Sequence, residues 1–229
     1  MDATAQPASK AIMLKGMFIV LALLFCVTLT GLPPVLQWLG VQNWPMRFFI
    51  TRLLFWACLV GAWYYCKKQE RQKILLWQQV PYPFWVYIVS LLAIYVTLLV
   101  GAGLIARLFA GLRLNISQTR EQQMFTMLRG RYWLVLLASI TAGFVEEILF
   151  RGYLLPRLAA VFSSKVWAVI LSSVLFGLLH FGYNSWYHIT GAFFIGLVFA
   201  VYYARFGNIT ILIICHFLWD FVILLAKTR

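Results

Sequence analysis

Apolar stretches about as long as a bilayer is thick recur along the whole chain, and they constrain its fold more than any other feature. A membrane-spanning helix needs roughly 20 mainly apolar residues, and about seven segments meet that length. They cover approximately residues 11–30, 46–66, 84–106, 132–155, 165–182, 187–204 and 208–226. With 63% hydrophobic and 11% charged residues, the chain lies outside the soluble range. The sequence therefore predicts an all-α, polytopic transmembrane helical bundle.

A basic segment between the third and fourth apolar stretches divides the chain. Residues 107–131 hold five arginines and a glutamate among scattered Leu, Phe and Met, a pattern typical of a loop or an interfacial amphipathic helix. We therefore expect a three-span region with a basic interfacial loop over residues 1–131 and a four-span catalytic core over residues 132–226. Lys15 interrupts the start of the first stretch and no small-residue cleavage site follows, so we expect this stretch to be retained.

The net charge of +13 is explained by basic residues in the short segments that flank the spans. Such side chains reach toward lipid headgroups while their stems stay in apolar surroundings. The sequence contains no soluble basic domain that could bind nucleic acid. The lipid bilayer is therefore an expected partner, and nucleic acid is not.

Ionisable side chains within the apolar stretches are rare, and function is expected where they occur. Three of the six acids, Glu146, Glu147 and Asp220, lie in predicted spans, as do two of the three histidines, His180 and His216. A charged side chain at bilayer depth costs at least about 2.5–3.5 kcal/mol on insertion scales, and such groups usually face a protein interior or a wet cavity. These residues are therefore the candidates for a functional site.

Helical spacing separates the two adjacent glutamates. Glu147 and Arg151 are four residues apart with the acid first, which is the favoured order for an ion pair on one helix face. Glu146 lies about 100° away around a regular helix and has no such partner. The spacing predicts one glutamate held by an arginine and one that is free to react.

The other two spans supply histidines at helical spacing. Phe176 and His180 are four residues apart, as are His216 and Asp220, and the Asp220 carboxylate could accept an imidazole N–H and fix its tautomer. The chain has no Ser-x-x-Lys pair or Gly-x-Ser-x-Gly elbow, so water is the expected nucleophile, with Glu146 as its general base. Histidines beside it could donate hydrogen bonds to a developing oxyanion.

A metal site is the rival use of the same side chains. Glu146, His180 and His216 form a two-histidine, one-carboxylate set that would suit zinc. The sequence lacks the H-E-x-x-H motif that would support it, so we prefer a reaction that requires no cofactor and keep zinc as the alternative. The remaining histidine, His188, lies in the connection FGYNSWYH, where we expect it at a membrane interface outside the site.

Together these motifs resemble the CPBP family of intramembrane proteases. That family includes the CAAX prenyl endoproteases of the Ras-converting type and bacterial bacteriocin-processing or immunity proteins (Abi-type). The resemblance covers about residues 132–226 and consists of E-E-x-x-x-R at 146–151, F-x-x-x-H at 176–180 and H-x-x-x-D at 216–220. The last motif commonly ends in Asn, whereas this chain has Asp220. An ionised Asp cannot donate to an oxyanion, so we expect Asp220 to orient His216 or to join a metal-ligand set.

The resemblance implies a catalytic cavity inside the bilayer and an enzyme of a bacterial cytoplasmic membrane. The implied activity is hydrolysis of a peptide bond near the end of a membrane-associated protein or peptide. Water would be activated by Glu146 and assisted by His180 and His216. The implied site residues are Glu146, Glu147, Arg151, His180, His216 and Asp220.

Two other functions stay open at this point. A non-catalytic immunity or scaffold membrane protein could use the same fold, although a scaffold does not need costly buried charges. A proton-coupled transporter could use the same acids and histidines as a proton relay, although the chain shows no internal repeat. Loss of peptide cleavage on removal of Glu146 would separate the endopeptidase from both.

Overall fold

Helices make up nearly all of the regular structure in the computed structural model, which describes residues 9–30, 32–114 and 119–229. No strand occurs in those ranges. The α-helices are α1 (Lys10–Phe25), α2 (Leu32–Trp38), α3 (Trp44–Tyr65), α4 (Phe84–Gly111), α5 (Thr119–Leu128), α6 (Tyr132–Ile140), α7 (Leu155–Phe162), α8 (Lys165–Leu179), α9 (Trp186–Phe206) and α10 (Ile209–Thr228). Between and after them lie π-helical or 3₁₀ turns at Cys26–Thr30, Cys66–Glu70, Thr141–Glu146, Ile148–Leu154 and His180–Tyr183.

Seven helical segments of the described ranges are long and apolar enough to cross a membrane, which confirms the predicted all-α polytopic bundle. They run over Lys10–Thr28, Trp44–Glu70, Phe84–Gly111, Tyr132–Phe162, Lys165–Tyr183, Trp186–Phe206 and Ile209–Thr228. The basic segment 107–131 begins inside α4 and continues as the ten-residue helix α5. Its residues 115–118 lie outside the described residues.

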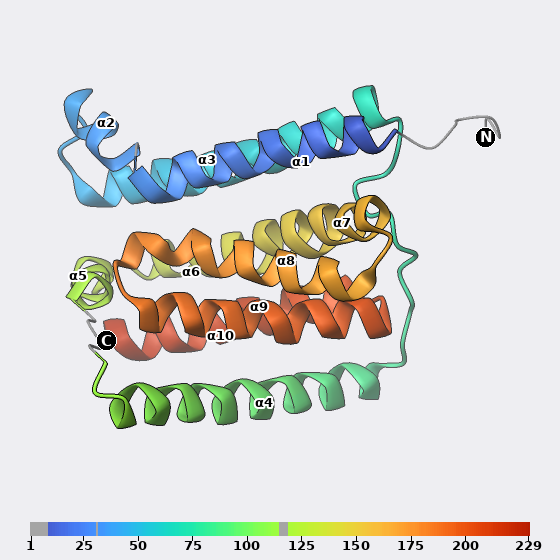
Figure 1. Ribbon diagram of the computed structural model, residues 1–229. Coiled ribbons are helices and arrows are strands. Elements are labelled where there is room, and N and C mark those ends of the chain that lie inside the picture. The colour runs from blue at the N-terminus through green and yellow to red at the C-terminus, as the bar shows by residue number, and fades with distance from the viewer. Residues whose placement is uncertain (1–8, 31, 115–118) are drawn as a thin grey trace.

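The first three spans lie on two opposite sides of the four-span part (Figure 1). Helices α1 and α3 run side by side along one side and contact α7 and α6, respectively. Helix α4 runs along the other side and packs on α9 and α10. The last four spans therefore occupy the middle of the bundle, where candidate side chains are shielded from lipid.

Large apolar side chains stay exposed on the outer surface of α4. Phe84 is 79% exposed, Leu92 63% and Leu99 62%. In water such a surface would promote association, since monomeric soluble proteins rarely expose large contiguous apolar patches. Lipid tails solvate it at no such cost, so this face suits a bilayer.

The connection from α3 to α4 helps to fix the start of α10. Its Val80 N–H donates to Gly207 O at 2.9 Å, and the Asn208 side-chain amide donates to Val80 O at 2.8 Å. The Asn208 side-chain oxygen, Oδ1, accepts from the Ile211 N–H at 3.0 Å, which caps the first turn of α10. This anchoring sets the position of the helix that carries His216.

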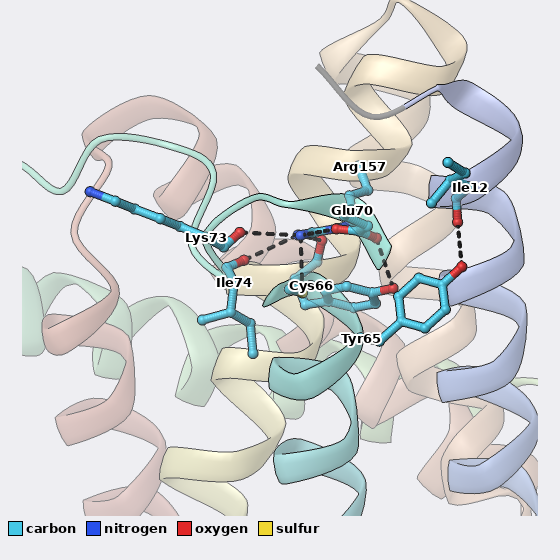
Figure 2. A network of polar contacts seen from close by, with 8 residues as sticks. Ile12, Tyr65, Cys66, Glu70, Lys73, Ile74 and Arg157 are labelled. Carbon is cyan, nitrogen blue, oxygen red and sulfur yellow. Dashed lines mark hydrogen bonds and ion pairs between the residues drawn. The ribbon is translucent and has the colours of Figure 1, made fainter. Parts of the chain in front are cut away.

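A buried ion pair ties the end of α3 to α7 (Figure 2). Arg157 Nε donates to Glu70 Oε1 at 3.1 Å and Oε2 at 2.8 Å. The guanidinium also donates to Ile74 O at 3.1 Å and to Tyr153 O at 3.0 Å. Glu70 is 2% exposed and Arg157 is 0% exposed. The Cys66 sulfur and Lys73 O complete the shell around this arginine.

Candidate active site

The span that carries both adjacent glutamates is not a regular α-helix. Between α6 and α7 the backbone is π-helical over Thr141–Glu146 and again over Ile148–Leu154. A π-turn closes its hydrogen bonds from i to i+5 instead of i+4, and such turns occur frequently at functional sites. The assumption of regular α-helical geometry in this segment was therefore wrong, because the turns that present Glu146 and Glu147 are wider.

Glu147 connects three parts of the four-span bundle. Its Oε1 accepts from Arg151 Nη1 at 2.8 Å and from His216 Nδ1 at 2.8 Å. Arg151 Nη2 donates further to Gly196 O of α9 at 3.2 Å. Glu147 is 0% exposed and Arg151 is 1% exposed. The ion pair predicted from the spacing is present, and it extends to a histidine on another helix.

Aromatic rings enclose this buried group. The guanidinium carbon of Arg151 lies 4.5 Å from the centre of the Phe176 ring and 5.3 Å from that of Phe199. Phe199 also meets the His216 ring edge-on, with 5.5 Å between centroids. Cations over aromatic faces are attracted by the ring quadrupole, more so when water is excluded. The aromatic residue of the F-x-x-x-H motif therefore holds Arg151 in place.

Asp220 does not orient His216 through a hydrogen bond, contrary to one of the two roles expected for it. The His216 ring turns Nδ1 toward Glu147, and Nε2 lies 3.9 Å from Asp220 Oδ2. That separation exceeds hydrogen-bond range. Spacing within α10 brings the two side chains together, but the contact between helices determines the ring orientation.

His180 lies where α8 ends and a 3₁₀ turn, His180–Tyr183, begins. Its Nδ1 lies 3.0 Å from Phe176 O. A carbonyl oxygen can only accept, so this contact places a proton on Nδ1 and leaves Nε2 as an acceptor in the neutral ring. A neutral His180 therefore suits an interaction with a water hydrogen rather than with an oxyanion, for which both histidines were expected to be donors.

Glu146 faces a cavity of about 690 Å³ that is also lined by His180, His216 and Asp220. Among the described residues it makes no ion pair and no side-chain hydrogen bond, and Glu147 does not line the cavity. Glu147 is thus engaged outside the cavity lining, whereas the Glu146 carboxylate is available inside the cavity. The cavity is therefore lined by one carboxylate without a partner among the described residues and by the imidazole rings of His180 and His216.

Other walls of the cavity were not anticipated from the sequence. His188 lines it, with Nε2 3.1 Å from Glu121 Oε2 of α5, whereas we expected this residue away from the cavity, at a membrane interface. The ring of Tyr183 stacks on His188 at 5.1 Å and on His180 at 6.1 Å. Arg52 of α3 also reaches the cavity. Arg52 is a charged residue inside the predicted span 46–66, so the reasoning applied to the buried acids could also have selected it as a candidate site residue.

The side chains do not form a metal-ligand cluster in this arrangement. In the part of the chain that the structure describes, no three His, Cys, Asp or Glu side chains are grouped closely enough to hold an ion. Nδ1 of His216 is engaged by Glu147 and Nδ1 of His180 by a backbone carbonyl, which leaves Nε2 of each ring as the nitrogen open to a ligand. Such bonds to the second ring nitrogen are also found behind metal ligands, so the spacing of Glu146, His180 and His216, and not their hydrogen bonds, is what disfavours zinc in this arrangement.

The four-span part also matches a known protein family. Residues 128–222 match the family model described as Type II CAAX prenyl endopeptidase Rce1-like. This part of the chain is similar to the Rce1-like family. The match confirms the resemblance stated from the motifs, and the Rce1-like segment contains all the residues of the proposed site. No curated protein and no solved structure matches the chain.

Two coarse conclusions follow from the Rce1-like match. The family supports a CAAX protease-like endopeptidase that acts within the membrane. Together with the seven apolar helices of the described residues, it indicates an integral, multi-pass membrane protein. Helices α3 and α4 supply part of the cavity wall and lie outside the matched residues, so the family match does not cover this part of the cavity.

Proposed function

We propose that this protein is an intramembrane endopeptidase of a bacterial cytoplasmic membrane. It hydrolyses a peptide bond near the end of a membrane-associated protein or peptide, and Glu146 activates the attacking water. The observation that carries the proposal is the contrast between the two adjacent acids. Glu147 is engaged by Arg151 and His216, whereas Glu146 lacks a partner among the described residues and lines the cavity.

In the proposed reaction the Glu146 carboxylate takes a proton from water while the water oxygen bonds to the carbonyl carbon of the scissile peptide. The carbonyl electron pair moves to oxygen and gives a tetrahedral oxyanion. Glu146 then returns the proton to the leaving nitrogen as the C–N bond breaks. The products are a carboxylic acid and an amine, and the glutamate is again ionised.

The two histidines are proposed to have different roles. His180 presents Nε2 as an acceptor because Nδ1 donates to Phe176 O, so it orients the attacking water beside Glu146. His216 is held at Nδ1 by Glu147. Protonated on both nitrogens, His216 would donate from Nε2 to the oxyanion. Asp220 Oδ2, 3.9 Å from that nitrogen, would stabilise the imidazolium charge.

The test compares cells that carry the wild-type protein, Glu146→Gln or the control Arg107→Gln. Arg107 lies on the exposed surface of α4 and does not line the cavity, so this control introduces the same amide away from the site. Peptides in membranes and medium are compared by mass spectrometry, and a peptide that depends on Glu146 is then assayed with purified protein. Loss of a general base lowers the rate by about 10²–10⁴-fold. Full cleavage by folded Glu146→Gln would overturn the proposal.

Two further measurements separate the alternatives. Activity of the purified protein in excess chelator, read beside metal analysis, is expected to be retained. A metal-dependent rate restored by zinc would replace the proposed reaction with a metal-assisted one. An immunity phenotype that survives Glu146→Gln, without any peptide that depends on Glu146, would instead assign the fold to a non-catalytic scaffold.

A further inference from the structure

Two arginines of α3 reach the cavity without an anionic partner. Arg47 and Arg52 both line it, and the Nε of each is buried without a hydrogen-bond partner. Neither side chain forms an ion pair within the described ranges. The fully buried arginines, Arg151 and Arg157, each have a carboxylate. The cavity arginines are therefore an exception that requires an explanation.

Aromatic packing orients Arg52, whose charge also interacts at longer range with the cavity acids Glu146 and Asp220, although neither acid forms an ion pair with it among the described residues. Its guanidinium carbon lies 4.8 Å from the centre of the Phe48 ring and 5.0 Å from that of Phe55. Two aromatic faces restrict the guanidinium plane and exclude water, but they carry no net charge. A rigid, planar fork of N–H donors is the geometry that binds a carboxylate in a bidentate manner. The cavity thus contains a preformed anion site beside a free general base.

We propose that Arg52, assisted by Arg47, binds the terminal carboxylate of the peptide substrate. This inference rests on the proposed endopeptidase function. Every peptide that is cut near its carboxyl end has a terminal carboxylate, whatever its side chains. The cavity contains two arginines that form no ion pair among the described residues and could bind this anion. A volume of about 690 Å³ lies within the roughly 300–1,000 Å³ of ordinary ligand sites, which suits the last residues of a chain.

The separation between the carboxylate site and Glu146 would determine which peptide bond is cut. With the carboxylate fixed on α3 and the water held by Glu146, the scissile bond is set by how many residues fit between the two sites. Helix α3 lies outside the residues that match the Rce1-like family. The selection of the cleavage position would therefore come from the amino-terminal spans, and the chemistry from the carboxy-terminal ones.

The test uses a pool of fluorescent peptides with apolar carboxy-terminal residues, prepared once as free acids and once as terminal amides. Amidation removes the terminal charge and little else. Binding is measured on Glu146→Gln protein in detergent, so no peptide is consumed. We expect the acids to bind at least about tenfold more tightly than the amides, a difference of about 1.4 kcal/mol.

Substitutions of Arg52 and Arg47 test whether these side chains cause the tighter binding of the free acids. In the Glu146→Gln protein, Arg52→Gln should bring acid binding down to the amide level and leave amide binding unchanged. Arg52→Lys should retain part of the preference, because it keeps the charge and loses the fork. Arg47→Gln should reduce it less, and it serves as the test if Arg52→Gln does not fold. Arg107→Gln, on the exposed surface of α4, is the matched control and should bind both pools like the parent protein.

Several results would overturn the proposal. Equal binding of acids and amides would do so, as would a preference that survives in both Arg52→Gln and Arg47→Gln. Competition by phosphatidylglycerol but not phosphatidylcholine nanodiscs, with no difference between the pools, would assign the arginines to a lipid phosphate instead. An acid preference in a wild-type protein that cleaves no peptide would support the carboxylate site and count against the endopeptidase.

Discussion

The buried Glu70–Arg157 pair allows a sharp prediction about stability. Glu70→Gln removes the negative charge but keeps an oxygen that can accept one hydrogen bond from the guanidinium. Arg157 then stays buried with only the neutral acceptors of its shell, such as Ile74 O and Tyr153 O. Removing one partner of a buried ion pair costs about 3–5 kcal/mol, because the other charge is left uncompensated. We expect a loss near the lower end, about 3 kcal/mol.

The measurement is the free energy of unfolding of purified protein in mild detergent, from a reversible denaturant titration. Glu121→Gln is the matched control, because its pair with His188 is partly exposed and such pairs contribute about 0–1 kcal/mol. The double variant Glu70→Gln/Arg157→Met should lose less than the sum of the single losses, since it leaves no orphaned charge. Equal stability of Glu70→Gln and Glu121→Gln would refute the reasoning.

Two further predictions concern the site itself. Glu147→Gln should lower both the free energy of unfolding and kcat, because Arg151 and His216 share the carboxylate and each charge-assisted bond contributes about 1.5–3 kcal/mol; normal values of both would contradict this role. Gly143→Ala should reduce activity and destabilise by about 1–3 kcal/mol, because an added Cβ would lie 2.8 Å from Ile213 O on α10. Gly61→Ala, where nothing lies within 4 Å, should match wild type in both assays.

Periodicity and composition predicted the features that depend on nearby residues. The apolar stretches gave the seven spans because bilayer thickness sets a length that any sequence can be measured against. The contact between Glu147 and Arg151 was predictable for the same reason, since a separation of four residues fixes which side chains can meet. Both are local properties of a helix, and both are present in the structure.

Contacts between helices could not be predicted by the same reasoning. His216 is held by Glu147, 69 residues away, instead of by Asp220 on its own helix. Glu70 lies among the basic residues of the segment 67–73, KKQERQK, yet it is buried against Arg157, 87 residues away. Spacing rules compare residues of one helix only. The packing of α10 and α7 against their neighbours determines these pairs, and no periodicity within one segment encodes it.

The two adjacent glutamates illustrate why one buried acid is structural and the other reactive. The cost of burying Glu147 is offset within the protein, because two hydrogen bonds of 2.8 Å engage its Oε1. Glu146 receives no such compensation from the described residues, so its carboxylate must be solvated by cavity water or by a ligand. Substitution of Glu146 by Gln should therefore lower the rate by about 10²–10⁴-fold without loss of stability, whereas the same change at Glu147 should reduce both activity and stability. The difference between the two variants measures the division of roles directly.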